Sequence, residues 1–226
     1  MADERHCRQI TRAAFSPAEQ RRIDSAVVAI CGLGGLGAPV ATYLAMAGVG
    51  EIIGVEDDCV ELSNLNRQFI YGIDDVGRSK ADVASDFLSA RVAGRVSVIE
   101  DRLTGDAPLQ TWFGRADLVV DCLDNMDSRN CVAEYCRRGG QPLVWGAVGG
   151  VNGYMGVGST ISDVFPDGAS ENAGRPAEVG VVGATCGIVG SAMAGLVLQI
   201  LCGRYDGRPR TWRFDGRSLS FSSFLS

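Results

Sequence analysis

The chain has 226 residues, 46% of them hydrophobic, and a net charge of −6. That length suits one large domain with a substantial core. The acidic balance argues against a nucleic-acid-binding protein, because a phosphate backbone calls for a basic face. The only histidine, His6, lies near the start, which nearly excludes histidine-based catalysis and histidine-rich metal sites.

The first residues have neither the apolar core nor the cleavage pattern of a signal peptide. Eight scattered cysteines include no C-x-x-C pair, which favours a reducing, cytoplasmic setting. The uncharged stretch 179–203 is long enough to cross a membrane. Its repeated glycines and soluble flanks instead favour a buried helix that packs closely on a sheet, so we expect no membrane partner.

Strands and helices are predicted to alternate over the first two thirds of the chain. Short apolar runs predict strands at 26–31, 51–56, 96–100, 117–121 and 142–145. Helices are predicted at 16–24, 37–48, 78–92 and 127–138, and 107–113 forms a short amphipathic segment. This order predicts an α/β fold, Rossmann-like and doubly wound, with a mostly parallel sheet.

The pattern changes after residue 150. Residues 152–161 alternate like a strand, and 162–178 form a polar, Gly- and Pro-rich stretch that predicts a mobile crossover loop. Residues 210–214 and 217–221 flank Asp215-Gly216 and predict antiparallel C-terminal strands. No repeat or second domain is evident, so we expect 1–226 to be a single domain.

A glycine-rich turn follows the first predicted strand and opens the next helix. Its sequence is GLGGLG, with glycines at Gly32, Gly34, Gly35 and Gly37. Glycine lets the backbone turn tightly and approach phosphate oxygens, and the helix N-terminus attracts the anion. Alone the motif is a weak signal, and a plain glycine turn is the alternative; its place between strand and helix favours a nucleotide site.

Polar residues follow the second and fourth predicted strands, at the edge where open α/β sheets bind ligands. Glu56 and Asp58 lie about 20 residues past the glycine turn, where a carboxylate can accept ribose hydroxyls. Asp124, in the run DCLDN with Asn125, is placed to hold Mg²⁺. A solvated acidic loop and a simple helix cap are the alternatives for the two groups.

The run SNLNRQ contains Asn64, Arg67 and Gln68, and Lys80 opens the next helix. Arg67 can grip phosphate oxygens in a fork and Lys80 can act as a point charge. Ordinary surface cations are the alternative. A dehydrogenase has no need of two cations here, whereas an enzyme that attacks a nucleotide phosphate does.

Together GLGGLG, the acidic strand end, SNLNRQF, the lysine of GRSK and DCLDN with Arg129 resemble the ubiquitin-activating-enzyme-like superfamily. The match is best to bacterial sulfur-carrier adenylyltransferases of the MoeB, ThiF and HesA type. The resemblance implies a homodimer that uses ATP and Mg²⁺ to adenylate the C-terminal Gly-Gly carboxylate of a small ubiquitin-fold carrier, releasing pyrophosphate.

The resemblance also implies roles for single residues. The glycines contact the nucleotide, and Glu56 takes the ribose position, where the family usually has Asp. The phosphates are lined by Asn64, Arg67, Gln68 and Lys80, and Asp124 serves the metal. Arg8 matches an arginine that the family delivers from the partner subunit.

Two departures from the family set further expectations. The chain lacks the two C-x-x-C pairs that bind structural zinc in many relatives, so we expect no zinc. The crossover loop contains no cysteine, with Pro176 nearest the family's position, and Cys186 is expected in the core. No covalent cysteine intermediate is therefore expected, and a separate sulfur donor would act on the activated carrier.

Three rival functions remain open on the sequence. An NAD-dependent oxidoreductase would leave SNLNRQ and Lys80 unexplained and would lack a histidine proton donor. A tRNA-nucleoside dehydratase of the same superfamily fits the acidic charge less well. A non-catalytic heterodimer partner is disfavoured because the expected phosphate-site residues all occur in this one chain.

Overall fold

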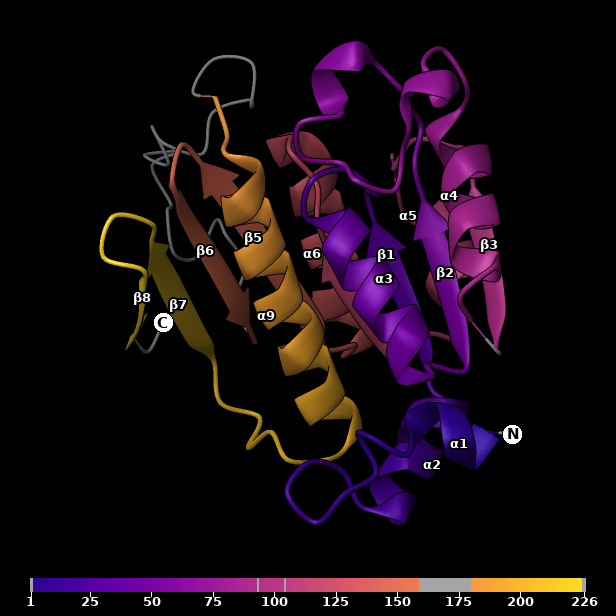
Figure 1. Ribbon diagram of the computed structural model, residues 1–226, viewed down its shortest axis with the longest axis vertical. Coiled ribbons are helices and arrows are strands. Elements are labelled where there is room, and N and C mark those ends of the chain that lie inside the picture. Colours follow the sequence, from indigo (N-terminus) through magenta and orange to yellow (C-terminus); the bar gives the residue numbers. More distant parts are fainter. Residues whose placement is uncertain (1, 93, 104, 159–179, 225–226) are drawn as a thin grey trace.

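The computed structural model describes residues 2–92, 94–103, 105–158 and 180–224, and its described strands form one sheet (Figure 1). The strand order is β3-β2-β1-β4-β5-β6-β7-β8. The first five strands of that order pair in parallel, and the rest pair antiparallel. The strands are β1 (Val27–Cys31), β2 (Glu51–Val55), β3 (Arg95–Ile99), β4 (Leu118–Asp121), β5 (Leu143–Gly149), β6 (Asn152–Val157), β7 (Arg210–Asp215) and β8 (Ser220–Phe224).

Helices cover both faces of this sheet, as the doubly wound prediction requires (Figure 1). One face carries α3 (Gly37–Ala47), α4 (Lys80–Ser89) and α9 (Gly183–Leu201), which share a large apolar core with the sheet. The other face carries α5 (Asp106–Phe113) and α6 (Met126–Gly139) over a smaller core. At the lower end of Figure 1 lie α1 (Ala2–His6) and α2 (Pro17–Ser25).

The predicted fold class is confirmed, and the elements differ from the prediction mainly at their ends. β5 runs on to Gly149, four residues past its predicted end, because it continues as a hairpin with β6. Its Gly146 lies under α9, where any Cβ would collide with Met193, so this glycine marks close packing rather than a loop. The last strand begins at Ser220, because Asp215 accepts backbone hydrogen bonds from Arg217 and Ser218 in the preceding turn. The predicted crossover loop at 162–178 lies outside the described residues.

The long apolar helix α9 packs closely against α3 and the strands β5 and β6. It is long and apolar enough to cross a membrane, by length and composition only. Here its buried residues include Val189, Gly190 and Met193. A Cβ at Gly190 would meet the ring of Pro39 and approach the carbonyl oxygen of Leu36 to 2.9 Å. Small residues of α9 therefore set its close approach to α3, whereas the sequence predicted close packing on the sheet, where Gly146 of β5 lies against Met193.

This contact predicts that Gly190→Ala lowers the free energy of unfolding by about 1–3 kcal/mol, because the added methyl overpacks a closed interface. Gly195→Ala is the matched control, since a Cβ there would meet nothing within 4 Å. Alanine at that helical position should raise the stability by about 0.5–1 kcal/mol. Urea denaturation of both variants measures the difference. Equal effects of the two substitutions would contradict the packing account.

Candidate active site

A cleft of about 850 Å³ opens at the carboxyl ends of β1, β2 and β4. Its volume is in the range of ordinary small-molecule sites. Most of the residues predicted for the site line it: Gly32, Gly34, Gly35, Glu56, Asp58, Asn64, Arg67, Gln68, Lys80, Asp124 and Asn125. The topology thus brings together segments that lie almost 100 residues apart in the chain. Gly37 and Arg8 are not part of the lining.

The glycine turn makes a tight connection between β1 and α3. Gly32 has φ +83°, a conformation that side chains disfavour. A Cβ on Gly37 would collide with the carbonyl oxygen of Gly32. Glycine at this position therefore allows the first residue of α3 to pack directly against the turn. Among the described residues, no side chain caps the first turn of α3. Ala38 N already donates to Gly34 O at 2.9 Å, so the N–H groups that precede Ala38 at this helix start are the ones available to an anion in the cleft.

The backbone of Leu33 is held on both sides at the centre of the turn. Its N–H donates to Glu56 Oε2 at 2.8 Å, and its carbonyl accepts from the Tyr71 hydroxyl at 3.0 Å. Its side chain is fully buried. These bonds fasten the turn to the end of β2 and to the segment above the cleft. The motif analysis missed Tyr71, because no sequence spacing predicts its contact with Leu33, which lies 38 residues earlier in the chain.

Glu56 has a structural role beyond the predicted ribose contact. The residue is only 7% exposed, and its second oxygen accepts the N–H groups of Asp57 and Asp58 at 3.2 Å. Burial raises the pKa of this carboxyl group, while the charge of Lys80 and the backbone donors oppose the shift. A carboxylate oxygen can accept more than one hydrogen bond, so the ribose contact stays a compatible prediction.

Lys80 is a buried cation at the edge of the cleft. It is the first residue of α4, after the N-cap Ser79, and its side chain is 5% exposed. Its Nζ lies 2.8 Å from Oδ2 of Asp58, whose side chain is 66% exposed. The predicted ribose residue Asp58 is therefore bound to the predicted phosphate residue. Because Asp58 is solvated, a phosphate group can replace it beside Lys80 at small cost.

The SNLNRQ segment presents polar groups that lack partners in the described structure. Nη1 of Arg67 donates to Ser63 O at 2.9 Å and to Asn66 Oδ1 at 2.8 Å, which leaves the rest of the guanidinium free toward the described residues. The amide oxygen of Gln68 is buried without a hydrogen-bond partner there. An unpaired buried polar group costs about 1–3 kcal/mol, so this amide oxygen beside the cleft would gain from a hydrogen bond to a ligand. The side-chain oxygen Oδ1 of Asn64 accepts from Glu61 N at 3.0 Å, and its side-chain N–H groups have no partner among the described residues.

A buried ion pair braces the loop between β4 and α6. Nη1 of Arg129 lies 2.9 Å from Oδ2 of Asp121, and both side chains are almost fully buried. Nη2 of Arg129 donates to the carbonyl of Gly146 on β5 at 2.6 Å and also bonds the carbonyl of Leu123. Burial raises the pKa of Asp121, and Arg129 opposes the shift. The loop that carries Asp124 is thereby fixed against the sheet.

Asp124 is available to a metal ion. The helix cap is Asn125, whose side-chain oxygen accepts from Ser128 N at 2.9 Å, so the alternative that Asp124 only caps this helix is wrong. Asp124 itself is exposed and makes no hydrogen bond with the described residues. One free carboxylate beside a phosphate site suits Mg²⁺, which takes one or two carboxylates plus phosphate oxygens. The residues present therefore fit this ion.

Cys186 is buried, as expected, but lies at the floor of the cleft. It is 1% exposed, and a Cβ on Gly35 would lie 3.0 Å from its Sγ. Burial raises the pKa of the Cys186 thiol to about 11, with a smaller opposing effect of Arg67. The thiol is therefore protonated at neutral pH, and a protonated thiol is a poor nucleophile.

Arg8 lies far from the cleft of its own chain. The N-terminal segment contacts the last turn of α3, where Gln9 Nε2 donates to Ala47 O at 2.7 Å. The glycine turn is at the other end of this helix, whose 11 residues span roughly 16 Å. Arg8 is exposed and makes no hydrogen bond or ion pair with the part of the chain that the structure describes.

The end of β3 also contributes to the cleft, through Asp101, Arg102 and Leu103. The motif analysis did not select these residues, although the carboxyl end of β3 points to the same edge. Their position after a parallel strand was the available signal.

Comparisons with known proteins show which family the chain belongs to. A model of the ThiF family matches residues 6–225. The chain is 33% identical over 226 residues to the sulfur carrier protein ThiS adenylyltransferase of Escherichia coli K12, covering 97% of this chain and 89% of that protein. It is 38% identical over 212 residues to the sulfur carrier protein adenylyltransferase of Thermus thermophilus, covering 88% and 78%. A crystal structure of E. coli MccB with succinimide shares the fold, with a TM-score of 0.81, 22% identity and coverage of 100% of this chain and 71% of that one. The chain therefore belongs to the ThiF family.

Proposed function

We propose that this protein adenylates the C-terminal Gly-Gly carboxylate of a small ubiquitin-fold sulfur carrier, using ATP and Mg²⁺ and releasing pyrophosphate. One observation carries the proposal. A single cleft combines an uncapped helix start at a glycine turn, the buried cation Lys80, the partly free guanidinium of Arg67 and the unpaired carboxylate of Asp124. The names of the two relatives support a sulfur carrier as the substrate.

The chemistry joins a carrier carboxylate to the α-phosphorus of ATP. A C–O–P bond forms, the bond from the α-phosphorus to the bridging oxygen breaks, and pyrophosphate leaves with that electron pair. The carboxylate is already ionised at pH 7, so no general base is needed. The barrier comes from bringing anions together, and this requires fixed positive charge and donors.

The described residues divide the binding of the nucleotide and the stabilisation of its charge among them. The N–H groups of the glycine turn and α3 bind phosphate oxygens, and Glu56 and Asp58 stand beside the ribose. Arg67 and Lys80 balance the charge that develops on the leaving phosphates, while Asn64, Gln68 and Asn125 offer amide hydrogen bonds. Bound at Asp124, Mg²⁺ would supply further positive charge to the phosphates.

The buried thiol of Cys186 supports release of the carrier as an acyl-adenylate, without a covalent enzyme intermediate. Its raised pKa and its place under Gly35 leave it neither ionised nor exposed. A separate sulfur donor would then act on the activated carrier. We also propose that the protein works without zinc and in the cytoplasm.

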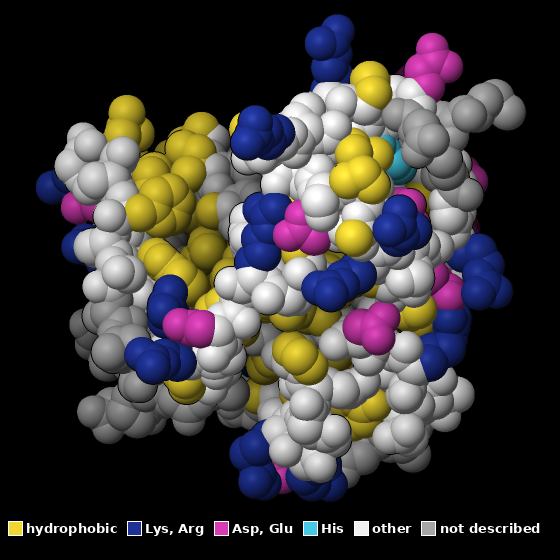
Figure 2. Space-filling view, turned by 90° about the horizontal axis from the view of Figure 1, so that it is seen from below, with side chains coloured by type: hydrophobic (Ala, Val, Ile, Leu, Met, Phe, Trp, Pro, Cys, Tyr) yellow, Lys and Arg dark blue, Asp and Glu magenta, His cyan; other side chains and the backbone are white. Residues whose placement is uncertain are grey.

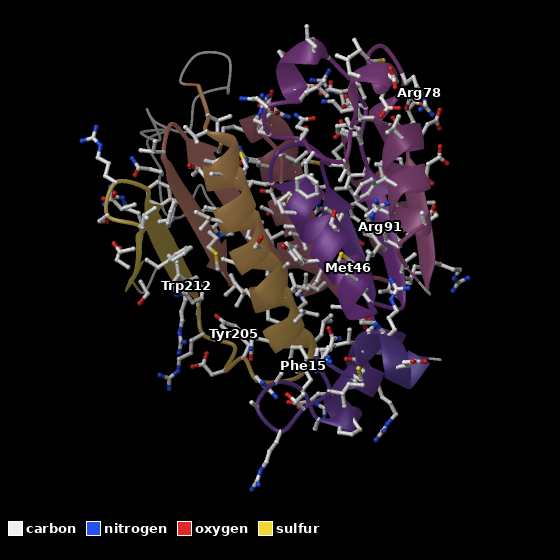
Figure 3. All side chains as sticks on the ribbon, in the orientation of Figure 1. Phe15, Met46, Arg78, Arg91, Tyr205 and Trp212 are labelled. Carbon is white, nitrogen blue, oxygen red and sulfur yellow. The ribbon has the colours of Figure 1, made fainter. Side chains whose placement is uncertain are left out.

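A two-fold dimer would complete the site. The faces of α3 and α9 form an apolar groove between them, where Tyr43 and Met46 on α3 and Ile188 on α9 are partly exposed; Met46 is labelled in Figure 3. A two-fold axis through this groove, perpendicular to α3, would place the partner's N-terminal segment beside this cleft. This arrangement gives Arg8, which its own cleft cannot use, a function in the partner's site.

The function is tested by ATP–pyrophosphate exchange with a panel of small carriers that end in Gly-Gly, ThiS of E. coli included. We expect exchange that depends on a carrier and is lost when its last glycine is removed. Exchange or ATP turnover with tRNA, and with no carrier, would instead support the dehydratase alternative. Absence of both would favour the non-catalytic partner.

Arg67→Ala and Lys80→Ala are each expected to reduce exchange by about 10²-fold or more, the usual effect of removing one preorganised charge donor. Arg78→Ala is the control, because its exposed guanidinium pairs with Asp75 and Asp86 and does not line the cleft. Wild-type exchange in both cleft variants would contradict the proposal.

Cys186→Ser is expected to retain carrier adenylation within a few-fold, because a protonated buried thiol takes no part in the reaction. Mass spectrometry of the intact proteins checks for a carrier–enzyme adduct that dithiothreitol cleaves. An adduct that forms in the wild type and vanishes in this variant would make Cys186 a nucleophile.

Mixing Arg8→Ala chains with Lys80→Ala chains tests the composite site. Each mixed dimer would rebuild one intact site from its two wild-type contributions, so random mixing should restore about a quarter of the wild-type activity. Subunit exchange is verified with tagged chains. No recovery after verified exchange would place Arg8 outside the partner's site.

A further inference from the structure

Arg8 occupies the tip of a turn whose two ends are anchored. The carbonyl of His6 accepts from the N–H groups of Gln9 and Ile10, both at 2.9 Å. Cys7 and Arg8 are therefore the two central residues of a β-turn, and both are exposed. A turn closed in this way holds the backbone of its tip in one conformation, while its side chains stay free.

His6 is buried on one side of this turn and anchors it by packing. Its side chain is 5% exposed, and Figure 2, which looks onto this end of the molecule, shows the histidine largely covered. It packs against Gly48, the C-cap residue that follows α3, where a Cβ would approach Nε2 to 2.9 Å and collide with Cε1. Gly48 has φ +93°, so glycine is required both for the backbone conformation and for the space that His6 fills.

Gln9 anchors the other side of the turn. Its Nε2 donates to Gln20 Oε1 and to Ala47 O, both at 2.7 Å. Gln20 is itself buried and donates to the same carbonyl at 3.0 Å and to Asp24 at 2.8 Å. The last carbonyls of a helix have no partner within the helix, so these amides fasten the segment to the end of α3 and to α2.

From these contacts we infer that His6 and Gln9 are positioning residues that hold Arg8 for use in the partner's site. The inference rests on the proposed composite site and adds the residues that fix the arginine. An exposed arginine on a free N-terminal segment would lose rotational freedom about many backbone and side-chain bonds when it binds a partner's nucleotide. That loss costs conformational entropy. Anchoring the turn at both ends removes the backbone part of that cost before the nucleotide binds, so only the Arg8 side chain has still to be ordered.

His6→Ala and Gln9→Ala should therefore reduce exchange activity by about tenfold to a hundredfold, the scale of a misplaced charged group, with ATP affinity less affected than turnover. Cys7→Ala is the matched control, because Cys7 shares the turn tip but anchors nothing in the described structure. The assay uses the Gly-Gly carrier that the wild-type chain accepts.

Complementation distinguishes positioning of Arg8 from a general structural role. A His6→Ala chain mixed with a Lys80→Ala chain should recover about a quarter of the wild-type activity, because the defect lies in what the chain donates and its own cleft is intact. The same chain mixed with Arg8→Ala should recover nothing, because both chains lack a well-placed arginine. Gln9→Ala should follow the same pattern, and it replaces His6→Ala if that variant does not fold.

Two results would overturn the inference. The first is unchanged activity of both variants. The second is no recovery with Lys80→Ala while Arg8→Ala and Lys80→Ala still recover together, because the defect would then lie in the variant's own cleft. Failure of that reference pair would instead refute the composite site itself, so the two failures are distinguishable.

Discussion

The fixed backbone of Leu33 is the constraint on which the rest of the cleft depends. Glu56 holds its N–H from the end of β2, and Tyr71 holds its carbonyl from the segment above the cleft. The turn cannot shift toward or away from the sheet without breaking one of these buried bonds. Because α3 begins immediately after it, the same bonds aim the helix N-terminus at the cleft. At its other end α3 contacts the N-terminal segment through Gln9, so one helix joins the glycine turn to the segment that carries Arg8.

Charge in the cleft is arranged so that an acidic protein can hold a nucleotide. The acids closest to the sheet are already satisfied, Glu56 by backbone N–H groups and Asp121 by Arg129. Buried charges with such partners stay in place, because losing a partner would leave an uncompensated charge. Lys80 is held by the exposed Asp58 and can exchange it for phosphate. The net charge of the chain therefore says little about the local potential that a triphosphate meets.

The sequence predicted the fold and most of the cleft because both follow from local patterns. Apolar runs that alternate with amphipathic ones predict a parallel sheet, and polar residues just after β1, β2 and β4 must then meet at one edge. What it could not show are contacts set by packing. Tyr71 bonds the backbone of Leu33, Gly146 is a packing residue inside a strand, and the carboxyl oxygens of Glu56 accept hydrogen bonds from the backbone. Such contacts depend on distances in the folded structure, which the spacing of residues along the sequence does not predict. The functional roles of the lining residues likewise stay predictions.

The central claim is that this cleft transfers AMP to a carrier carboxylate. Mass spectrometry of a Gly-Gly carrier after incubation with the enzyme, ATP and Mg²⁺, in the presence of pyrophosphatase, tests it most directly. We expect a carrier that gains one AMP at its C-terminus and no adduct on the enzyme. The pyrophosphate released is detected as the two phosphates that pyrophosphatase makes from it, and no ADP forms. ATP cleaved to ADP and phosphate, with every carrier left unmodified, would contradict it.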